Sequence, residues 1–345
     1  MSHFVVMVFS AEEPTKDALK TILAPWHEFE CTGWDNEFVQ NVDKTADLRE
    51  RYATDERDML RSPEGALFEA YDDRFYRART AEEEAGADRF DRGRKIRFVP
   101  EGYVEERVPT REVMSFRQYV EREDCDRVVP FGAEPDTAGA HKYGYVLLTA
   151  DGDVYKVIDR TNPNKKWDWW TVGGRWSGML VPDGTRKADG SPDVLRIRDI
   201  PIATLRDAAG SEAGKRWDRR TAIVAGRPIP NFAALRQAHG VQAARDMYWA
   251  DPVMAAFQAA NEHFLEERDL DEIRGTREAA IERARQSALT PFAVVKDGQW
   301  HERGSMGWFA CVHDEKDRDA WDREFSALFD TLPPDTWVAV VDCHI

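Results

Sequence analysis

The segment from Asn162 to Gly178 combines residue types that bind aromatic and anionic groups. It reads NPNKKWDWWTVGGRWSG and holds four of the chain's 12 tryptophans. A tryptophan ring can stack on a nucleobase, and a guanidinium can hold a phosphate with two hydrogen bonds. A Gly-Gly pair lets backbone N–H groups approach an anion closely. We expect a site for a nucleotide or nucleic-acid component, formed here by Asn164, Lys165, Trp167, Asp168, Trp169, Arg175 and Trp176.

The same segment has a structural alternative. If it is a strand, alternation places Trp167 and Trp169 on one face and Asp168 with Trp170 on the other. The tryptophans would then form a packing cluster, with Arg175 paired to Asp168 or stacked on a ring. The chain has no P-loop or dinucleotide-binding glycine pattern, which argues against an ordinary NTPase or NAD enzyme.

A second loop, residues 301–308, repeats these residue types. Its sequence HERGSMGW places His301 beside Glu302, as a general base and its partner. Arg303 and Trp308 would extend the ligand site. The alternative is an ordinary glycine-rich connection between strands.

Four residues are candidate metal ligands: His27, Cys31, Cys343 and His344. The first two have i, i+4 spacing, which on a helix places both on one face. Thiolate and imidazole groups suit zinc, the cofactor we would expect in such a site. No CxxC or HxxxH pair supports a metal site, and adjacent residues in a strand face opposite sides. A buried cysteine beside a hydrogen-bonded histidine is the alternative.

Whether chemistry follows binding is left open by the sequence. The candidate acid–base residues are His27, Glu28, His301 and His344. A cysteine nucleophile, Cys31 or Cys343, oriented through a histidine by Glu28 or Asp342, is an alternative.

Several motifs resemble, as a set, a family of bacteriophage and prophage proteins. They are HEFECTG at 27–33, KYGYV at 142–146, WDWW-x2-GGRWSG at 167–178, KDGQW at 296–300, GSMGW at 304–308 and VVDCHI at 340–345. The resemblance implies an accessory protein made in the cytoplasm of an infected cell, and it implies no mechanism. Accessory proteins of phages act on nucleic acids, nucleotides or host defences.

The chain is strongly acidic, with 64 Asp and Glu against 48 Lys and Arg and a formal net charge of −16. This balance disfavours broad, non-specific binding to nucleic acid. It favours a rival function, a non-enzymatic protein that blocks a host defence factor with its acidic surface. The alternative is that the charge only maintains solubility.

The 345 residues are 42% hydrophobic, enough for a sizeable core, and no run approaches the 18 apolar residues of a membrane span. Four cysteines without a secretory signal favour the reducing cytoplasm.

We expect an α+β fold with antiparallel sheet from both chain ends. The pattern predicts a core of 1–180 plus 290–345 and a mostly helical insertion at 181–289. It predicts strands at 4–9, 292–295, 299–301, 308–312 and 337–341, with helices from 15 and 314. Strands at 143–148 and 154–158 flank an Asp-Gly turn. In a ferredoxin-like element the last strand lies antiparallel beside the first, which places His344 near His3.

Overall fold

The computed structural model describes residues 2–345 apart from 88–90, 125–126, 183–192, 263–266 and 308–310. It confirms an α+β fold. The chain divides into two compact units, Met1–Glu28 with Asn164–Ile345 and Phe29–Pro163. This division differs from the one expected from the sequence, which was a core of 1–180 plus 290–345 with an insertion of 181–289. The expected division stays a prediction.

A mixed sheet built from both chain ends forms the centre of the first unit. Its strands are β1 (His3–Ser10), β11 (Trp169–Val172), β12 (Val194–Arg196), β13 (Ala293–Lys296), β14 (Gln299–Glu302) and β17 (Trp337–His344). The order is β11-β17-β1-β13-β14, with β12 also pairing with β17. Strand β17 runs antiparallel to β1, and β13 runs parallel to it. The expected pairing of the first and last strands is confirmed; the ferredoxin-like arrangement stays a prediction.

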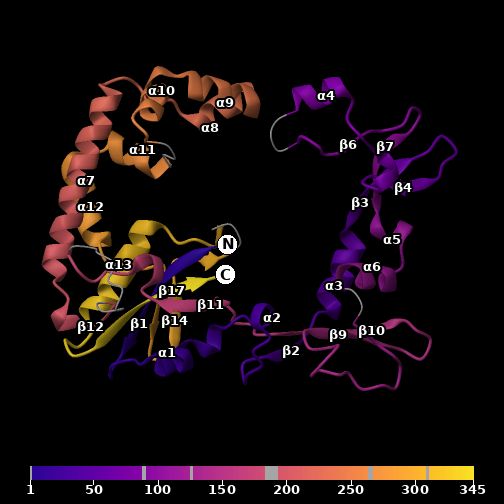
Figure 1. Cartoon of the computed structure of the whole chain (residues 1–345), viewed down its shortest axis with the longest axis horizontal. Coiled ribbons are helices and arrows are strands. Elements are labelled where there is room, and N and C mark those ends of the chain that lie inside the picture. Colours follow the sequence, from indigo (N-terminus) through magenta and orange to yellow (C-terminus); the bar gives the residue numbers. More distant parts are fainter. Residues whose placement is uncertain (1, 88–90, 125–126, 183–192, 263–266, 308–310) are drawn as a thin grey trace. The chain divides into compact units, whose positions relative to one another are not determined.

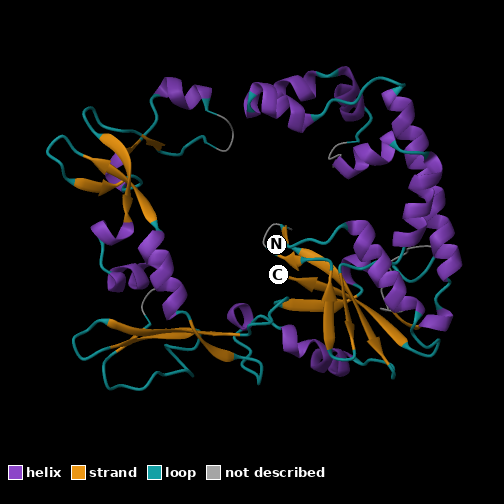
Figure 2. Ribbon diagram, turned by 180° about the vertical axis from the view of Figure 1, so that it is seen from behind, coloured by secondary structure: helices purple, strands orange, loops and turns teal. Residues whose placement is uncertain are grey.

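Two helices cover opposite faces of this sheet, α1 (Lys16–Leu23) and α13 (Arg318–Asp330). In Figure 1 α13 lies above the sheet and α1 below it, and Figure 2 shows the same layers from behind. The central strands are continuous apolar runs because both of their faces are buried. Thr15 and Asp317 cap the two helices by accepting hydrogen bonds from backbone N–H groups. Helix α13 thus begins at 318, four residues later than expected.

Short 3-10 helices and a separate two-stranded sheet, β15–β16, lie among the other elements of the first unit. They are η1 (Ala24–Trp26), η3 (Gly174–Trp176), η4 (Ile197–Asp199), β15 (Ser305–Met306) and β16 (Val312–His313). The strand expected at 308–312 lies mostly outside the described residues. As far as it is described, the start of the range 181–289, expected to be mostly helical, contains β12 before the first helix begins at Ile202.

The second unit combines small sheets with short helices. Its elements are α2 (Phe29–Thr32), β2 (Gln40–Asp43), α3 (Thr45–Thr54), β3 (Glu56–Arg61), β4 (Leu67–Glu69), η2 (Asp73–Phe75), β5 (Tyr76–Arg77), α4 (Ala81–Gly86), β6 (Ile96–Arg97), β7 (Val104–Pro109), α5 (Thr110–Val113), α6 (Phe116–Asp124), β8 (Val128–Val129), β9 (Gly144–Leu148) and β10 (Val154–Thr161). The β9–β10 hairpin around Asp151-Gly152 is confirmed. The charged stretch 44–90, in which no strand was predicted, contains β3 and β4. These strands form because pairing with β7 buries Met59 and Leu60 while charged neighbours stay outside.

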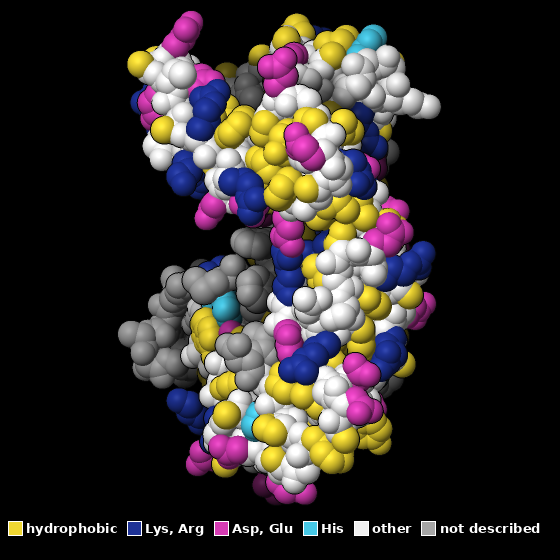
Figure 3. Space-filling model, turned by 90° about the vertical axis from the view of Figure 1, so that its right-hand side faces the viewer, with side chains coloured by type: hydrophobic (Ala, Val, Ile, Leu, Met, Phe, Trp, Pro, Cys, Tyr) yellow, Lys and Arg dark blue, Asp and Glu magenta, His cyan; other side chains and the backbone are white. Residues whose placement is uncertain are grey.

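Charged side chains of both signs are interspersed on the face that Figure 3 shows, with hydrophobic groups between them. That face presents no broad field of one sign. Within the described residues, no helix has both the length and the apolar composition needed to cross a membrane.

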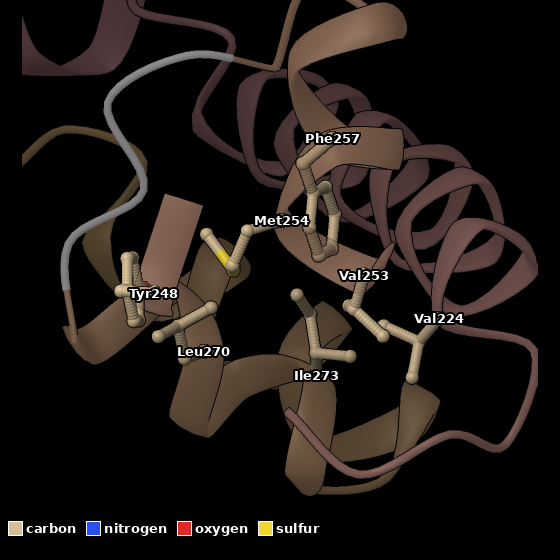
Figure 4. Packing of buried hydrophobic residues seen from close by; sticks show 7 residues of the cluster. All are labelled: Val224, Tyr248, Val253, Met254, Phe257, Leu270 and Ile273. Carbon is tan, nitrogen blue, oxygen red and sulfur yellow. The ribbon is translucent and has the colours of Figure 1, made fainter. Parts of the chain in front are cut away.

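Helices form the rest of the first unit, as the sequence predicted. They are α7 (Ile202–Val224), α8 (Phe232–His239), α9 (Val241–Ala250), α10 (Pro252–Ala259), α11 (Glu267–Arg274) and α12 (Arg277–Ser287). Helices α7 and α12 lie side by side (Figure 1), where Gly210 and Gly214 of α7 face arginine side chains of α12. Figure 4 shows the apolar cluster that joins α7, α9, α10 and α11, with Tyr248, Met254, Phe257 and Leu270 among its members.

Candidate functional site

Two histidines from opposite ends of the chain pair across β1 and β17. His3 lies directly opposite His344, and Trp169 of β11 lies opposite His344 on its other side. Directly paired residues in antiparallel strands present their side chains on one face. The His344 ring stacks on Trp169 with centroids 5.1 Å apart, and the His3 ring meets it edge to face at 5.0 Å. The expected proximity of His344 and His3 is confirmed.

Each histidine has its own carboxylate partner. Nδ1 of His3 lies 2.9 Å from Oδ1 of Asp342, and Nδ1 of His344 lies 2.7 Å from Oδ1 of Asp168. A carboxylate accepts hydrogen bonds, so it assigns the proton of a neutral imidazole to Nδ1 and leaves Nε2 as a base. A carboxylate that orients an imidazole in this way prepares it for general acid–base chemistry.

The Gly173-Gly174 pair leaves room for a carboxylate to approach the backbone. The N–H of Arg175 donates to Oδ2 of Asp342 at 2.9 Å. Gly174 has φ +53°, and a Cβ on it would lie 2.4 Å from Cβ of Asp342. A side chain at 174 would therefore displace the carboxylate that holds His3.

Asp193 occupies the other half of this loop. It is buried and accepts hydrogen bonds from the N–H of Gly178 and the hydroxyl of Ser177, both at 2.7 Å. We had expected the loop's N–H groups to meet a ligand anion. The N–H groups of Arg175 and Gly178 instead bind the protein's own carboxylates.

A pocket of about 330 Å³ opens beside His3. It lies between the His3 end of the sheet and the first turns of α13. We call it the His3 pocket; the residues that matter below are His3, Trp176, Arg303, Arg318, Trp321 and Asp322. Trp176 and Arg303 were predicted from two loops far apart in the sequence, and the structure brings both to this pocket.

The pocket's cationic groups are held in place by their neighbours. The Arg303 guanidinium lies 5.0 Å from the centroid of the Phe292 ring, and its Nε lies 2.9 Å from Oε1 of Glu315. Nε of Arg318 lies 3.8 Å from the same Glu315 oxygen. Two guanidinium groups that share one carboxylate stay close together, which is a suitable arrangement for binding a phosphate.

Other predicted residues lie in the core or elsewhere on the sheet. His27 is 2% exposed and packs against Trp167, whose Nε1 donates to the carbonyl of Leu23. His27 thus lies in the core, away from the lining of the His3 pocket, and its catalytic role stays a prediction. Glu28 forms an ion pair with Lys165 at 3.2 Å. Strand β11 begins only at Trp169, so Trp167 precedes the strand; it is buried, whereas Trp169 is exposed.

The remaining candidates that the structure describes lie outside the lining of the His3 pocket. His301 pairs with Val294 in the β13–β14 hairpin. The side chains of Arg175 and Asn164 are exposed. Trp308 lies outside the described residues, so its predicted role stays a prediction.

The four expected zinc ligands do not form a metal site. In the described part of the chain, no three His, Cys, Asp or Glu side chains are arranged to hold a metal ion. Helix α2 begins at Phe29, so His27 and Cys31 do not share a helix face. Cys343 is opposite Phe4 and Trp170, on the other face from His344. Burial, with the charges of Asp342 and Asp168, raises the pKa of its thiol well above the usual range.

Three polar residues that line the His3 pocket were not predicted as site residues from the sequence. His3 entered only as a neighbour of His344, although the strand pairing was a usable signal. Arg318 and Asp322 lie one turn apart on α13 and resemble ordinary charged positions of a surface helix. Only the packing of α13 against β1 makes them pocket residues.

Comparison with known protein families, characterised proteins and solved structures gives no match to this chain.

Proposed function

We propose that this chain is a phage-type accessory protein that binds a nucleotide or nucleic-acid component in the His3 pocket and acts on it by acid–base chemistry. One observation carries the proposal: an imidazole oriented by a buried carboxylate lines a pocket that also holds two arginines and two tryptophans. Arginine binds the phosphate, tryptophan packs on a base or sugar, and the imidazole moves a proton.

His3 is the catalytic candidate because it lines the pocket. In hydrolysis of a phosphate ester, a water oxygen bonds to phosphorus while Nε2 of His3 takes one water proton. The bond from phosphorus to the leaving oxygen breaks, and the imidazolium returns the proton to that oxygen. Arg303 and Arg318 neutralise the charge that develops on the phosphate.

His344 is a positioning residue in this proposal. Its side chain is 7% exposed, its ring is stacked on Trp169 and edge-on to His3, and Asp168 holds its Nδ1. The ring fixes the orientation of His3 from behind without reaching the pocket lining.

The rival function is an acidic protein that blocks a host factor, which would need a docking face of one charge sign. The face in Figure 3 mixes both signs of charge and is not such a docking face.

The test is calorimetric titration with nucleoside monophosphates. Arg303→Gln keeps a polar side chain but removes the charge, and it should weaken binding about tenfold, or about 1.4 kcal/mol. Arg323→Gln is the control, because Arg323 is exposed on the same helix outside the His3 pocket. Arg175→Ala should also bind normally, since Arg175 contributes its backbone N–H. Equal binding by Arg303→Gln and wild type would refute the proposed site.

A further inference from the structure

Trp169 carries an aromatic ring that is exposed and yet held in place. The residue is 44% exposed, and its ring stacks on the His344 ring with an interplanar angle of 16°. One oxygen, Oδ1 of Asp168, accepts hydrogen bonds from the backbone N–H of Trp169 and from Nδ1 of His344, both at 2.7 Å. The same aspartate therefore fixes both members of the stack.

The distances between three rings show which face of the indole is open. The ring centroid of Trp169 lies 5.1 Å from that of His344 and 5.2 Å from that of His3, and the two histidine centroids are 5.0 Å apart. In such a nearly equilateral triangle His3 lies beside the stack and does not cover it. The side chain of His344 is only 7% exposed, so the indole face turned away from it is the one that meets solvent.

The two tryptophans of the His3 pocket are less suited to stack on a nucleobase. Trp321 is 2% exposed, its Nε1 donates to the carbonyl of Pro291, and Nζ of Lys316 lies 5.0 Å from its ring centroid. Trp176 lines the pocket but is less exposed than Trp169. Stacking on a base requires an open aromatic face, and Trp169 presents one.

His3 connects Trp169 to the pocket. It lines the pocket, and its ring is nearly perpendicular to the Trp169 ring, at 81°. A phosphate in the pocket and a base on Trp169 would therefore both lie next to His3. In a nucleotide the sugar joins these two groups, so the bond between phosphate and sugar would lie beside the imidazole.

We infer that Trp169 is the base-stacking residue of this site, and that the ligand's nucleobase extends the stack formed by His344 and Trp169. This inference rests on the proposed function of the His3 pocket. The indole is already fixed, so little conformational entropy is lost when a base binds, and the base removes apolar surface from water. The ligand class is therefore a nucleotide, and a sugar phosphate without a base should bind more weakly.

The experiment is calorimetric titration with adenosine 5′-monophosphate and with ribose 5-phosphate, two ligands that differ by the base. The wild type should bind the nucleotide about tenfold more tightly, the size of effect expected of one base stacked on one aromatic ring. Trp169→Leu should remove this difference and leave the affinity for ribose 5-phosphate unchanged. Trp169→Phe keeps an aromatic face and should retain most of the difference.

Trp249→Leu is the matched control. Trp249 is 46% exposed, close to the exposure of Trp169, but it belongs to α9 and lies outside the lining of the His3 pocket. This variant should bind both ligands as the wild type does. A second readout is the indole N–H signal of Trp169 in a ¹H–¹⁵N spectrum, assigned with Trp169→Phe. The nucleotide should shift this signal further than ribose 5-phosphate does, because a stacked base adds its ring current.

Two outcomes would overturn the inference alone. If Trp169→Leu binds the nucleotide as tightly as the wild type while Arg303→Gln binds it more weakly, the base lies elsewhere and the proposed function stands. If Trp169→Leu loses affinity equally for both ligands, Trp169 only supports the histidine cluster. Binding of neither ligand by the wild type would overturn the inference and the proposed function together.

Discussion

His3 and His344 lie directly opposite each other in the β1–β17 ladder, and their rings meet edge to face with centroids 5.0 Å apart. Each donates through Nδ1 to a different aspartate, Asp342 or Asp168. The two termini of the chain thus form one polar cluster, and the stability of that cluster can be measured separately from ligand binding.

Replacing Asp342 by asparagine should destabilise the protein. The carboxylate is 3% exposed and accepts hydrogen bonds from His3 and from the N–H of Arg175. Loss of these charge-assisted bonds in a buried setting costs about 1–3 kcal/mol. Urea unfolding monitored by tryptophan fluorescence measures it. Asp335→Asn, at an aspartate whose side chain is 72% exposed, should change stability by less than about 0.5 kcal/mol. Similar values for the two variants would contradict the cluster's role.

Gly174→Ala should destabilise the folded protein more than the same substitution does at an ordinary left-handed glycine. At Gly298, φ is +70° and a new Cβ meets nothing within 4 Å, so Gly298→Ala isolates the backbone strain of about 1–2 kcal/mol. At Gly174 the same strain is joined by the 2.4 Å approach to Asp342. We expect roughly 1–3 kcal/mol of additional destabilisation from this overpacking. Thermal unfolding of both variants measures the two losses of stability. Equal losses at the two positions would contradict a steric conflict between a Cβ at 174 and Asp342.

The sequence predicted the strands of the central sheet well because they are long apolar runs, as in Phe4–Phe9 and Trp337–Val341. It also predicted the helical stretch after 211 and the meeting of His344 with His3. It failed for β3, where the burial of Met59 and Leu60 depends on pairing with β7, about 45 residues further along the chain. Arg318 and Asp322 were not predicted as pocket residues for the same reason, because no local pattern shows which surface helix packs over β1. The sequence correctly indicated a close approach of an anion at Gly173-Gly174. The anions are the carboxylates of Asp342 and Asp193, which lie outside the motif and were not predicted as its partners.

Acid should lower the stability of the helical part of the first unit, because Glu262 becomes protonated there. Burial alone would raise the pKa of this carboxyl, but hydrogen bonds from Arg219 and Arg220 outweigh it and hold the pKa below its usual value. A depressed pKa in the folded state contributes stability above the unfolded pKa of about 4.3, and this stability is lost as pH falls through the folded pKa.

The matching substitution is Glu262→Gln. It should cost about 1–3 kcal/mol at neutral pH, and the difference from wild type should shrink in acid as Glu262 itself becomes protonated. Urea unfolding across a pH series measures both variants. A difference that stays constant with pH would show that the arginines do not stabilise the ionised form.

Cys343 should resist alkylation in the native protein. Its side chain is buried and its thiol pKa is raised, while Cys31 and Cys311 are exposed. Maleimide labelling followed by peptide mapping should find modification at 31 and 311, with 343 modified only after unfolding. Rapid native labelling of Cys343 would show that the β17 face opposite His344 opens to solvent.

The most direct test of the central claim is long-range ¹H–¹⁵N NMR of the histidine rings, with and without a nucleoside monophosphate. His3→Gln and His344→Gln variants assign the signals. The account predicts that both neutral rings carry the proton on Nδ1, and that the ligand shifts the Nε2 signal of His3 while His27 in the core stays unchanged. Protonation of Nε2 in the neutral His3 ring, or no response of His3 to any of the nucleotides, would contradict it.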